Sequence, residues 1–198
     1  MFPLGSVVFP SQVVPLHIFE ERYRQLMTDI TAPDAEATFG IVLLDRGHEV
    51  GSSYTGITVA TRVKVLQAEE FDDGRWGTVT AGVERLTIHE WLPEDPYPQA
   101  MVSSRTVDDD GGGSLSDLKA LLLDTLTEVA SRASAKMPDE LGFSSDPHQL
   151  LDQISAIAPV TAFDRQQVLE ATSTSDQIAK LTDALEGKLV VLRAMNDE

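Results

Sequence analysis

Apolar and polar residues alternate along the first half of the chain, whereas in the second half apolar residues recur every three or four positions. The first spacing is typical of half-buried strands, and the second is typical of amphipathic helices. The sequence therefore predicts a β-rich half followed by a helical half. The alternating stretches predict strands at 13–18, 38–44, 57–71, 75–92 and 97–107.

One helix interrupts the first half, at residues 19–30. Glu20 and Glu21 stand in its first turn, where the helix dipole favours negative charge. The predicted buried face of this helix consists of Phe19, Tyr23, Leu26, Met27 and Ile30. Pro15 restricts the preceding strand to a sheet edge or a bulge. We expect the helix that follows this strand to close one end of the sheet.

The two longest predicted strands form a hairpin, because Asp-Gly is a strong signal for a two-residue turn. With Asp73-Gly74 as that turn, Phe71 lies opposite Trp76, and both side chains point away from the core. The core-facing positions predicted near the turn are Leu66, Ala68, Val79 and Ala81.

The apolar positions of this hairpin change parity near Val65 and Gly82. A change of parity on both strands predicts a bulge or a sharp bend. Long, bent antiparallel strands are what a small closed or half-closed barrel requires.

The clearest boundary in the chain is the run DDDGGG at 108–113, which has no apolar side chain to contribute to a core. Beyond it, helix starts are predicted at Ser114, at Asp146-Pro147, at Thr161, and at Ser173 or Ser175. The inward face of the last helix is predicted to carry Ile178, Leu181, Leu185, Leu189 and Leu192. We therefore expect a barrel subdomain at 1–107, a linker at 108–113 and a helical subdomain at 114–198.

Composition narrows the classes of partner. The 198 residues carry 15 Lys and Arg against 32 Asp and Glu, for a formal net charge of −17. Such a chain repels phosphate backbones and anionic lipid, so we expect no nucleic acid and no membrane as partner. With no cysteine, no apolar run of membrane-spanning length and no basic start typical of a signal peptide, the expected location is the cytoplasm.

Several stretches together resemble a known family. FPLGSVVFPSQVVPLHIFEERYRQLM resembles the opening of the Lon N-terminal domain, the substrate-binding region of ATP-dependent Lon proteases. FGIVLL, AEEFDDGRWGTVTAGVERLTIHEWL and PEDPYPQAMV follow in that family's order, and FDRQQVLEATSTSDQIAKL resembles its end. The resemblance covers nearly the whole chain. It implies an α+β fold, with a small PUA-like antiparallel β-barrel and one short helix followed by a C-terminal helical bundle.

The chain departs from the complete Lon proteases in its catalytic motifs. It contains no G-x-x-x-x-G-K-[ST] phosphate-binding loop. No Ser–Lys protease motif accompanies its five lysines, which are Lys64, Lys119, Lys136, Lys180 and Lys188. The resemblance therefore implies protein binding by a standalone module without an ATPase or a protease part, and we expect no enzyme activity.

Metal and cofactor chemistry finds no support in the sequence. The four histidines are His17, His48, His89 and His148. No two of them have the spacing of metal ligands on one helix, and the chain has no cysteine thiol that could complete a site. The acidic run at 108–110 lacks the later ligands of a calcium loop. We therefore expect neither a catalytic residue, nor a metal, nor a cofactor.

The predicted binding surface lies around the hairpin. The outward pair of Phe71 and Trp76 is either covered by another element of the fold or exposed as an apolar patch. If it is exposed, it suits binding, because aromatic side chains are frequent contact residues at protein interfaces and exposed strand edges accept added strands. The residues predicted to bind peptide are Phe71, Trp76, Trp91, Pro15 and His17.

The sequence predicts a non-catalytic substrate-recognition or adaptor module that binds unfolded or extended polypeptide or a protein partner. One alternative is a hydrolase with an unrecognised site in the cleft between barrel and helices. Another is an RNA-binding protein, which a PUA-like fold permits by analogy alone. The apolar stripes of the helical half also allow a homodimer.

Overall fold

The computed structural model describes residues 1–44, 56–138 and 141–194. The chain divides into two compact units, Met1–Arg105 and Thr106–Glu198, which we call the sheet unit and the helical unit. Residues 45–55, which include His48, lie outside the described residues.

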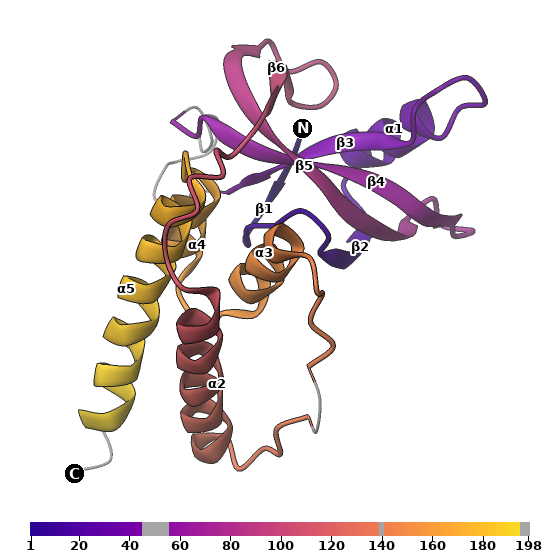
Figure 1. Cartoon of the computed structure of the whole chain (residues 1–198). Helices are drawn as coiled ribbons and strands as arrows, with labels where there is room; N and C mark the ends of the chain where they lie inside the picture. The colour runs from indigo at the N-terminus through magenta and orange to yellow at the C-terminus, as the bar shows by residue number, and fades with distance from the viewer. Residues whose placement is uncertain (45–55, 139–140, 195–198) are drawn as a thin grey trace. The chain divides into compact units, whose positions relative to one another are not determined.

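A six-stranded mixed sheet forms the sheet unit (Figure 1). The strand order is β1-β3-β4-β5-β2, and β6 also pairs with β5. The resemblance implied an antiparallel sheet. The observed sheet is mixed, because β1 runs parallel to β3. The strands are β1 (Phe2–Leu4), β2 (Val13–Ile18), β3 (Thr38–Leu43), β4 (Val59–Glu70), β5 (Trp76–Leu92) and β6 (Gln99–Arg105).

The long strand β5 organises this sheet. One edge of β5 pairs with β4, and the other edge is shared between β2, opposite residues 76–81, and β6, opposite residues 85–92. The register of β4 on β5 shifts between Arg62 and Val63 and again between Val65 and Gln67. These shifts confirm the predicted bulge, and they let one pair of strands bend through the whole unit.

Helix α1 (Glu21–Ile30) packs its apolar side into the core of the sheet unit. Tyr23, Leu26 and Met27 are buried in one cluster with Phe2 and residues of β2, β3 and β4. The rings of Phe2 and Tyr23 lie 4.7 Å apart between centroids. Phe19 does not share this face: it precedes the helix and is 62% exposed, so its predicted inward position is wrong.

The hairpin between β4 and β5 has a three-residue loop, Asp72 to Gly74, where the sequence predicted a two-residue turn. The backbone N–H of Phe71 donates to the carbonyl of Arg75 (2.8 Å), and Gly74 takes a φ of +78°. This is the usual geometry of a three-residue hairpin loop, with glycine in the left-handed position. Phe71 therefore lies opposite Arg75, and Glu70 lies opposite Trp76.

A shift of one residue exchanges the two faces of a strand. None of the four residues predicted to face the core near the turn is buried. Leu66 is 53% exposed, and Val79 and Ala81 share the outer face with their β2 partners. Trp76, predicted to point outward, packs instead against the core cluster beneath α1.

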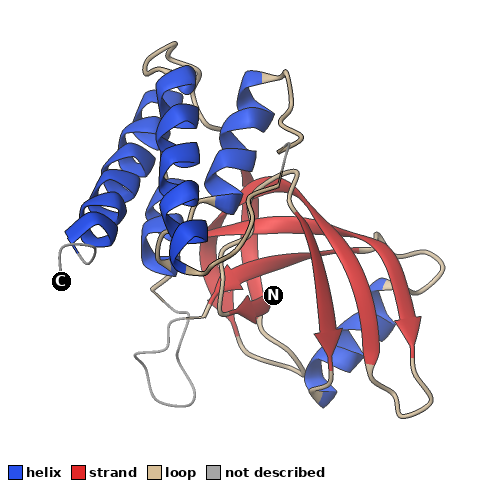
Figure 2. Cartoon of the chain, turned by 90° about the horizontal axis from the view of Figure 1, so that it is seen from below, coloured by secondary structure: helices blue, strands red, loops and turns tan. Residues whose placement is uncertain are grey.

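In its described residues the helical unit contains four helices, drawn in blue in Figure 2. They are α2 (Leu115–Arg132), α3 (Pro147–Ile157), α4 (Ala162–Leu169) and α5 (Thr174–Ala194). Their predicted starts are confirmed, since Ser114, Asp146 and Thr161 each accept a backbone hydrogen bond from the first turn of their helix. For the last helix, Ser173 has this role, accepting from Asp176 N (3.3 Å).

The buried face of α5 is the one predicted from its spacing, from Ile178 to Leu192. No stretch of the described helices combines the length and the hydropathy of a bilayer-spanning segment. Residues 106–113 fall in the helical unit, where Asp108 exchanges backbone hydrogen bonds with Thr172 and Thr174 (3.0 and 2.9 Å). Whether 108–113 also acts as a separate linker stays a prediction.

Candidate functional site

The outward side of β2 is exposed on the surface of the sheet unit. Val13, Pro15 and His17 are exposed, whereas Leu16 and Ile18, at alternate positions, lie in the core. This alternation is the ordinary consequence of strand geometry at a sheet with one buried face. The surface continues onto β5, because Pro15 pairs with Val79 and His17 with Gly77.

Three rings gather at the end of β2. The centroid of the His17 ring lies 6.2 Å from that of Phe19 and 6.2 Å from that of Phe71. Phe19 is 62% exposed, Phe71 is 39% exposed and Val13 is 57% exposed. We call the set Val13, Pro15, His17, Phe19 and Phe71 the β2 surface.

Gly77 makes room for Phe71 on this surface. A Cβ atom built at Gly77 would lie 3.0 Å from Cζ of Phe71, closer than an ordinary van der Waals contact. The Phe71 ring therefore lies against the backbone of β5, beside the imidazole of His17 from the neighbouring strand. The corrected hairpin register places Phe71 on this side of the sheet.

The two tryptophans predicted for the site lie elsewhere. Trp76 pairs with Ile18 and packs against the core cluster of α1. Trp91 packs against a second buried cluster, formed by Val42, Ala60, Leu86 and Ile88. The pairing of β5 with β6 shifts between Ile88 and Glu90, so Trp91 does not share the exposed face of His89. Of the five predicted residues, the structure brings together Pro15, His17 and Phe71.

A cleft of about 810 Å³ opens beside α1 in the same unit. Its walls come from one side of α1, with the residue before it, and from the turn between β5 and β6, and four of its seven side chains are carboxylates. The lining residues are Glu20, Glu21, Arg22, Gln25, Asp29, Asp95 and Pro96.

Arg22, the single cation of this cleft's lining, already forms ion pairs. The Arg22 guanidinium lies 3.0 Å from a Glu20 carboxylate oxygen and 2.6 Å from one of Glu94. Near the end of α1 the Tyr97 hydroxyl donates to Asp29 (2.8 Å), another residue of the lining. Burial, followed by this hydrogen bond, raises the pKa of Tyr97 to about 12, so the phenol stays protonated. The cleft therefore has a net negative lining.

The helical unit has a smaller groove of about 540 Å³ between the start of α4 and the exposed side of α5. Its apolar lining includes Val160 and Val191, and its rim carries Asp164, Asp183 and Lys188. Phe163, 67% exposed, lies on the first turn of α4. No pattern in the sequence predicts this groove.

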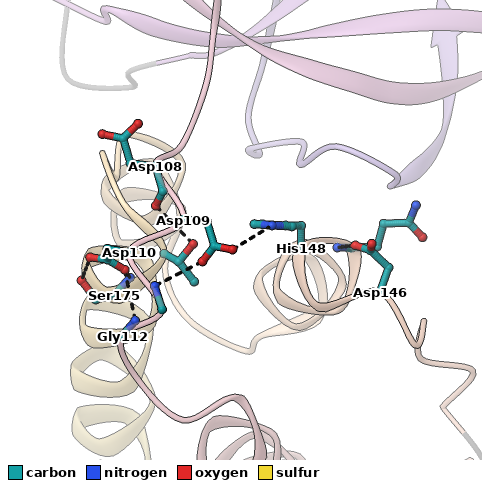
Figure 3. Close-up of polar contacts among 10 residues, drawn as sticks. Asp108, Asp109, Asp110, Gly112, Asp146, His148 and Ser175 are labelled. Carbon is teal, nitrogen blue, oxygen red and sulfur yellow. Dashed lines mark hydrogen bonds and ion pairs between the residues drawn. The ribbon is translucent and has the colours of Figure 1, made fainter.

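The acidic run at 108–110 is tied to the helical unit (Figure 3). The Asp110 carboxylate accepts hydrogen bonds from Ser175 Oγ and from the backbone N–H of Ser175 (3.0 Å), at the start of α5. The Ser175 hydroxyl is the main reason that the pKa of Asp110 is lowered to about 2. Asp109 lies 3.6 Å from Nε2 of His148. Across the described parts of the chain, no three His, Asp or Glu side chains are grouped so as to hold a metal ion.

One serine and one histidine lie within hydrogen-bond distance of each other. His89 Nε2 is 2.8 Å from Ser103 Oγ, on the exposed sides of β5 and β6. Neither the cleft beside α1 nor the groove beside α4 is lined by this pair. The pair therefore gives no support to the hydrolase alternative, since a nucleophile needs a walled site that holds its substrate.

The exposed position of Phe19 differs from the sequence-based expectation. Its apolar character fits the helical periodicity, which predicts a place on the buried face. The better signal is the adjacent pair Glu20-Glu21: acidic residues favour a first turn, which puts Phe19 before the helix and at the end of an edge strand.

Comparison with known protein families gives one extensive match. The family described as the ATP-dependent protease La (LON) substrate-binding domain matches residues 1–187. The curated proteins similar to the chain include a Lon protease of Rhizobium meliloti, 23% identical over 192 residues, and a Lon protease of Anaeromyxobacter dehalogenans, 28% identical over 206 residues. These matches cover 94% and 97% of the chain but 23% of each relative. The chain thus spans about a quarter of the length of the curated relatives that it matches.

The solved structures that share the fold include two Lon N-terminal domains. One is a Lon N-terminal domain protein from Xanthomonas campestris, with a TM-score of 0.62, 18% identity and coverage of 92% of this chain and 95% of that one. The other is the N-terminal domain of a Mycobacterium avium complex Lon protease, with a TM-score of 0.64, 20% identity and coverage of 93% and 96%. Both alignments extend over the sheet and the helices.

Proposed function

Because the chain belongs to the family of the ATP-dependent protease La (LON) substrate-binding domain, we propose that it is a non-catalytic module that binds unfolded or extended polypeptide. In this role it recognises polypeptide clients, as an adaptor or a substrate-recognition module. The family description, which names substrate binding, supports this proposal, and so does the surface chemistry of the sheet unit.

The observation that carries the proposal is the β2 surface. Soluble proteins rarely expose several apolar side chains together, and aromatic residues are frequent anchors at interfaces. Phe19, Phe71 and His17 form a ring cluster, and Val13 and Pro15 extend it along an edge strand. An unfolded chain exposes the apolar side chains that this surface would cover.

Charge supports polypeptide as the partner rather than nucleic acid. The net charge of −17 repels a phosphate backbone, and binding to nucleic acid depends on clustered Lys and Arg. A non-catalytic role is supported by the missing phosphate-binding loop motif and by the match of the chain to the substrate-binding family alone.

Three further expectations belong to this proposal. A PUA-like barrel is supported by the hydrogen bond from the Met1 nitrogen to Pro98 O (2.5 Å), which brings the start of β1 next to β6. A helical bundle is supported by the shared buried faces of α2 and α5. A cytoplasmic location is supported by the absence of cysteine, and a homodimer stays a prediction.

The proposal predicts that Phe71→Ser weakens the binding of an unfolded polypeptide while changing the melting temperature by only a few degrees. Removing a central aromatic anchor costs about 1.4 kcal/mol or more, which is at least about tenfold in Kd. The measurement is fluorescence anisotropy with labelled, reduced and carboxymethylated α-lactalbumin, together with thermal unfolding of each variant.

Phe163→Ser is the matched control, because it removes an exposed phenylalanine from the helical unit. It is expected to leave the Kd within about twofold. Trp76→Ser removes a ring that packs against the core and is expected to lower the melting temperature markedly. Equal loss of binding in Phe71→Ser and Phe163→Ser would contradict the proposed site.

A further inference from the structure

Strand β2 has one neighbour in the sheet as far as the described residues show. It pairs with β5 along its whole length, from Val13 opposite Ala81 to Ile18 opposite Trp76, and the strand order ends with it. A strand at the end of a sheet presents a row of unpaired N–H and C=O groups on its other side.

The even-numbered residues of β2 direct their backbone groups toward β5. Val14 O accepts a hydrogen bond from the Thr80 hydroxyl (3.0 Å), and Gln12 O accepts one from Gly82 N (2.9 Å). Successive residues of a strand direct their backbone groups to opposite sides. Val13, Pro15 and His17 therefore direct theirs to the free side.

Pro15, which has no backbone N–H, fits this position because its backbone nitrogen faces the free side of β2. A proline directed toward β5 would leave a carbonyl of that strand without its donor. The free edge consequently offers two N–H groups, those of Val13 and His17, and the carbonyls of Val13, Pro15 and His17. Pro15 removes the middle donor, so a ladder formed here is short and weaker than a complete strand pair, as reversible binding of a client requires.

Carboxylate side chains follow the end of β2. Phe19 follows β2 and is followed by Glu20 and Glu21, which line the cleft beside α1 together with Asp95. Arg22 in the same cleft is engaged by Glu20 and Glu94. A segment that runs past the end of β2 therefore meets unbalanced carboxylates, which favour a Lys or Arg side chain at that point.

We propose that an extended polypeptide segment adds to the free edge of β2 as a further strand, with a basic residue beside Glu20 and Glu21. The inference rests on the proposed function and names how the polypeptide is held. Backbone hydrogen bonds to the edge supply affinity for any extended sequence, the ring cluster covers apolar side chains, and the carboxylates select a basic residue at one end.

N-methylation of a peptide tests the backbone part of the proposal. The probe is a fluorescein-labelled seven-residue peptide of alternating valine and threonine with a lysine added at one end, measured by anisotropy with the full chain. In a strand added to β2, every second N–H faces the edge. Methylating one alternate set of amides should weaken binding about tenfold or more, and methylating the other set should change it less than about twofold.

Two changes in the protein test the same edge. Pro15→Thr restores the missing donor and should tighten binding of the unmethylated peptide about fivefold. His17→Pro removes a donor and should weaken binding about fivefold beyond the effect of His17→Ala, which removes the imidazole but keeps the N–H. Melting temperatures of all three variants identify any that fail to fold.

Replacing the peptide lysine by glutamine tests the charge. With the lysine placed at each end in turn, the tighter of the two peptides should lose at least about threefold in affinity, and Glu21→Gln in the protein should abolish that difference. If both methylated sets bind equally, strand addition is overturned while the proposed function stands. If the lysine peptide binds no tighter than the glutamine peptide at either end, the proposed position of a basic residue beside Glu20 and Glu21 is overturned. If no unfolded polypeptide binds at all, both proposals fall.

Discussion

Gly82 shows how a single residue sets the path of the chain in the sheet unit. Its N–H donates to Gln12 O, and its carbonyl accepts from Ser11 N (both 2.9 Å), where the segment before β2 crosses β5. A Cβ atom at this position would lie 2.1 Å from the carbonyl oxygen of Phe9. Since backbone rather than a flexible side chain occupies that space, glycine is required there.

Gly82→Ala is therefore expected to destabilise the sheet unit by about 2 to 3 kcal/mol, the cost of forcing extra atoms into a packed interior. Gly187→Ala is the control, because no atom lies within 4 Å of the added Cβ and alanine favours the helix. It should be neutral or stabilising by up to about 1 kcal/mol. Urea unfolding of both variants measures the difference, and an unchanged midpoint for Gly82→Ala would show that the crossing can move.

Of the residues predicted to bind peptide, Pro15, His17 and Phe71 lie together on one exposed surface, whereas the two tryptophans pack against buried clusters. That this surface binds peptide stays a prediction. Trp76 turns inward because the hairpin loop is one residue longer than predicted, and Trp91 turns inward at the register shift between Ile88 and Glu90. The Asp73-Gly74 dipeptide is compatible with a two-residue or a three-residue loop, and tertiary packing of Trp76 under α1 accompanies the second. The sequence around Asp73-Gly74 is compatible with either loop length. The register of the hairpin, and with it the face on which each side chain lies, could therefore not be derived from the sequence.

At the scale of elements, the ends of helices were predictable because their signals are local. Ser114, Asp146 and Thr161 each act on backbone N–H groups within three residues along the chain. The start of α5 has an additional partner that no local signal reveals. Asp110, 65 residues away in sequence, accepts hydrogen bonds from Ser175 at this helix start.

The pH dependence of the helical unit should report this contact. Because the pKa of Asp110 is lowered to about 2, mainly by the Ser175 hydroxyl, its stabilising effect is complete above the unfolded pKa of about 3.9 and is lost as the pH falls toward 2. Asp110→Asn should lower the melting temperature at pH 6, and the gap from the unmodified chain should close between about pH 4 and pH 2.

Circular dichroism at a helical wavelength follows this transition. Asp183→Asn, on the exposed side of α5, serves as the charge-matched control and should show no such convergence. A gap between Asp110→Asn and the unmodified chain that stays constant down to pH 2 would mean that the Asp110 carboxylate does not hold the start of α5.

At the scale of the whole molecule, the order of elements was predictable and the arrangement of the sheet was less so. The switch from alternating to helical spacing separates a strand-rich unit from a helical unit. The parallel pairing of β1 with β3 was not predicted, because a three-residue strand carries too little pattern to reveal its partner. The cleft beside α1 could not be foreseen either, since its walls come from segments about 70 residues apart.

The two units differ in what they expose. The sheet unit presents the β2 surface beside a cleft of negative charge, and the helical unit presents a smaller apolar groove beside α4. The rings of the β2 surface and its edge strand together match the features of an unfolded chain, which has free backbone groups and apolar side chains. These features are the reason that the proposed polypeptide binding is placed on the sheet unit rather than on the helical unit.

The most direct measurement is a titration of the full chain with one protein in two states, native α-lactalbumin and its reduced, carboxymethylated, unfolded form. The account predicts saturable binding of the unfolded form, no measurable binding of the native form, and an intact unfolded polypeptide after prolonged incubation. Equal binding of both forms, binding of neither, or cleavage of the unfolded form would contradict the claim that this chain recognises unfolded polypeptide without cutting it.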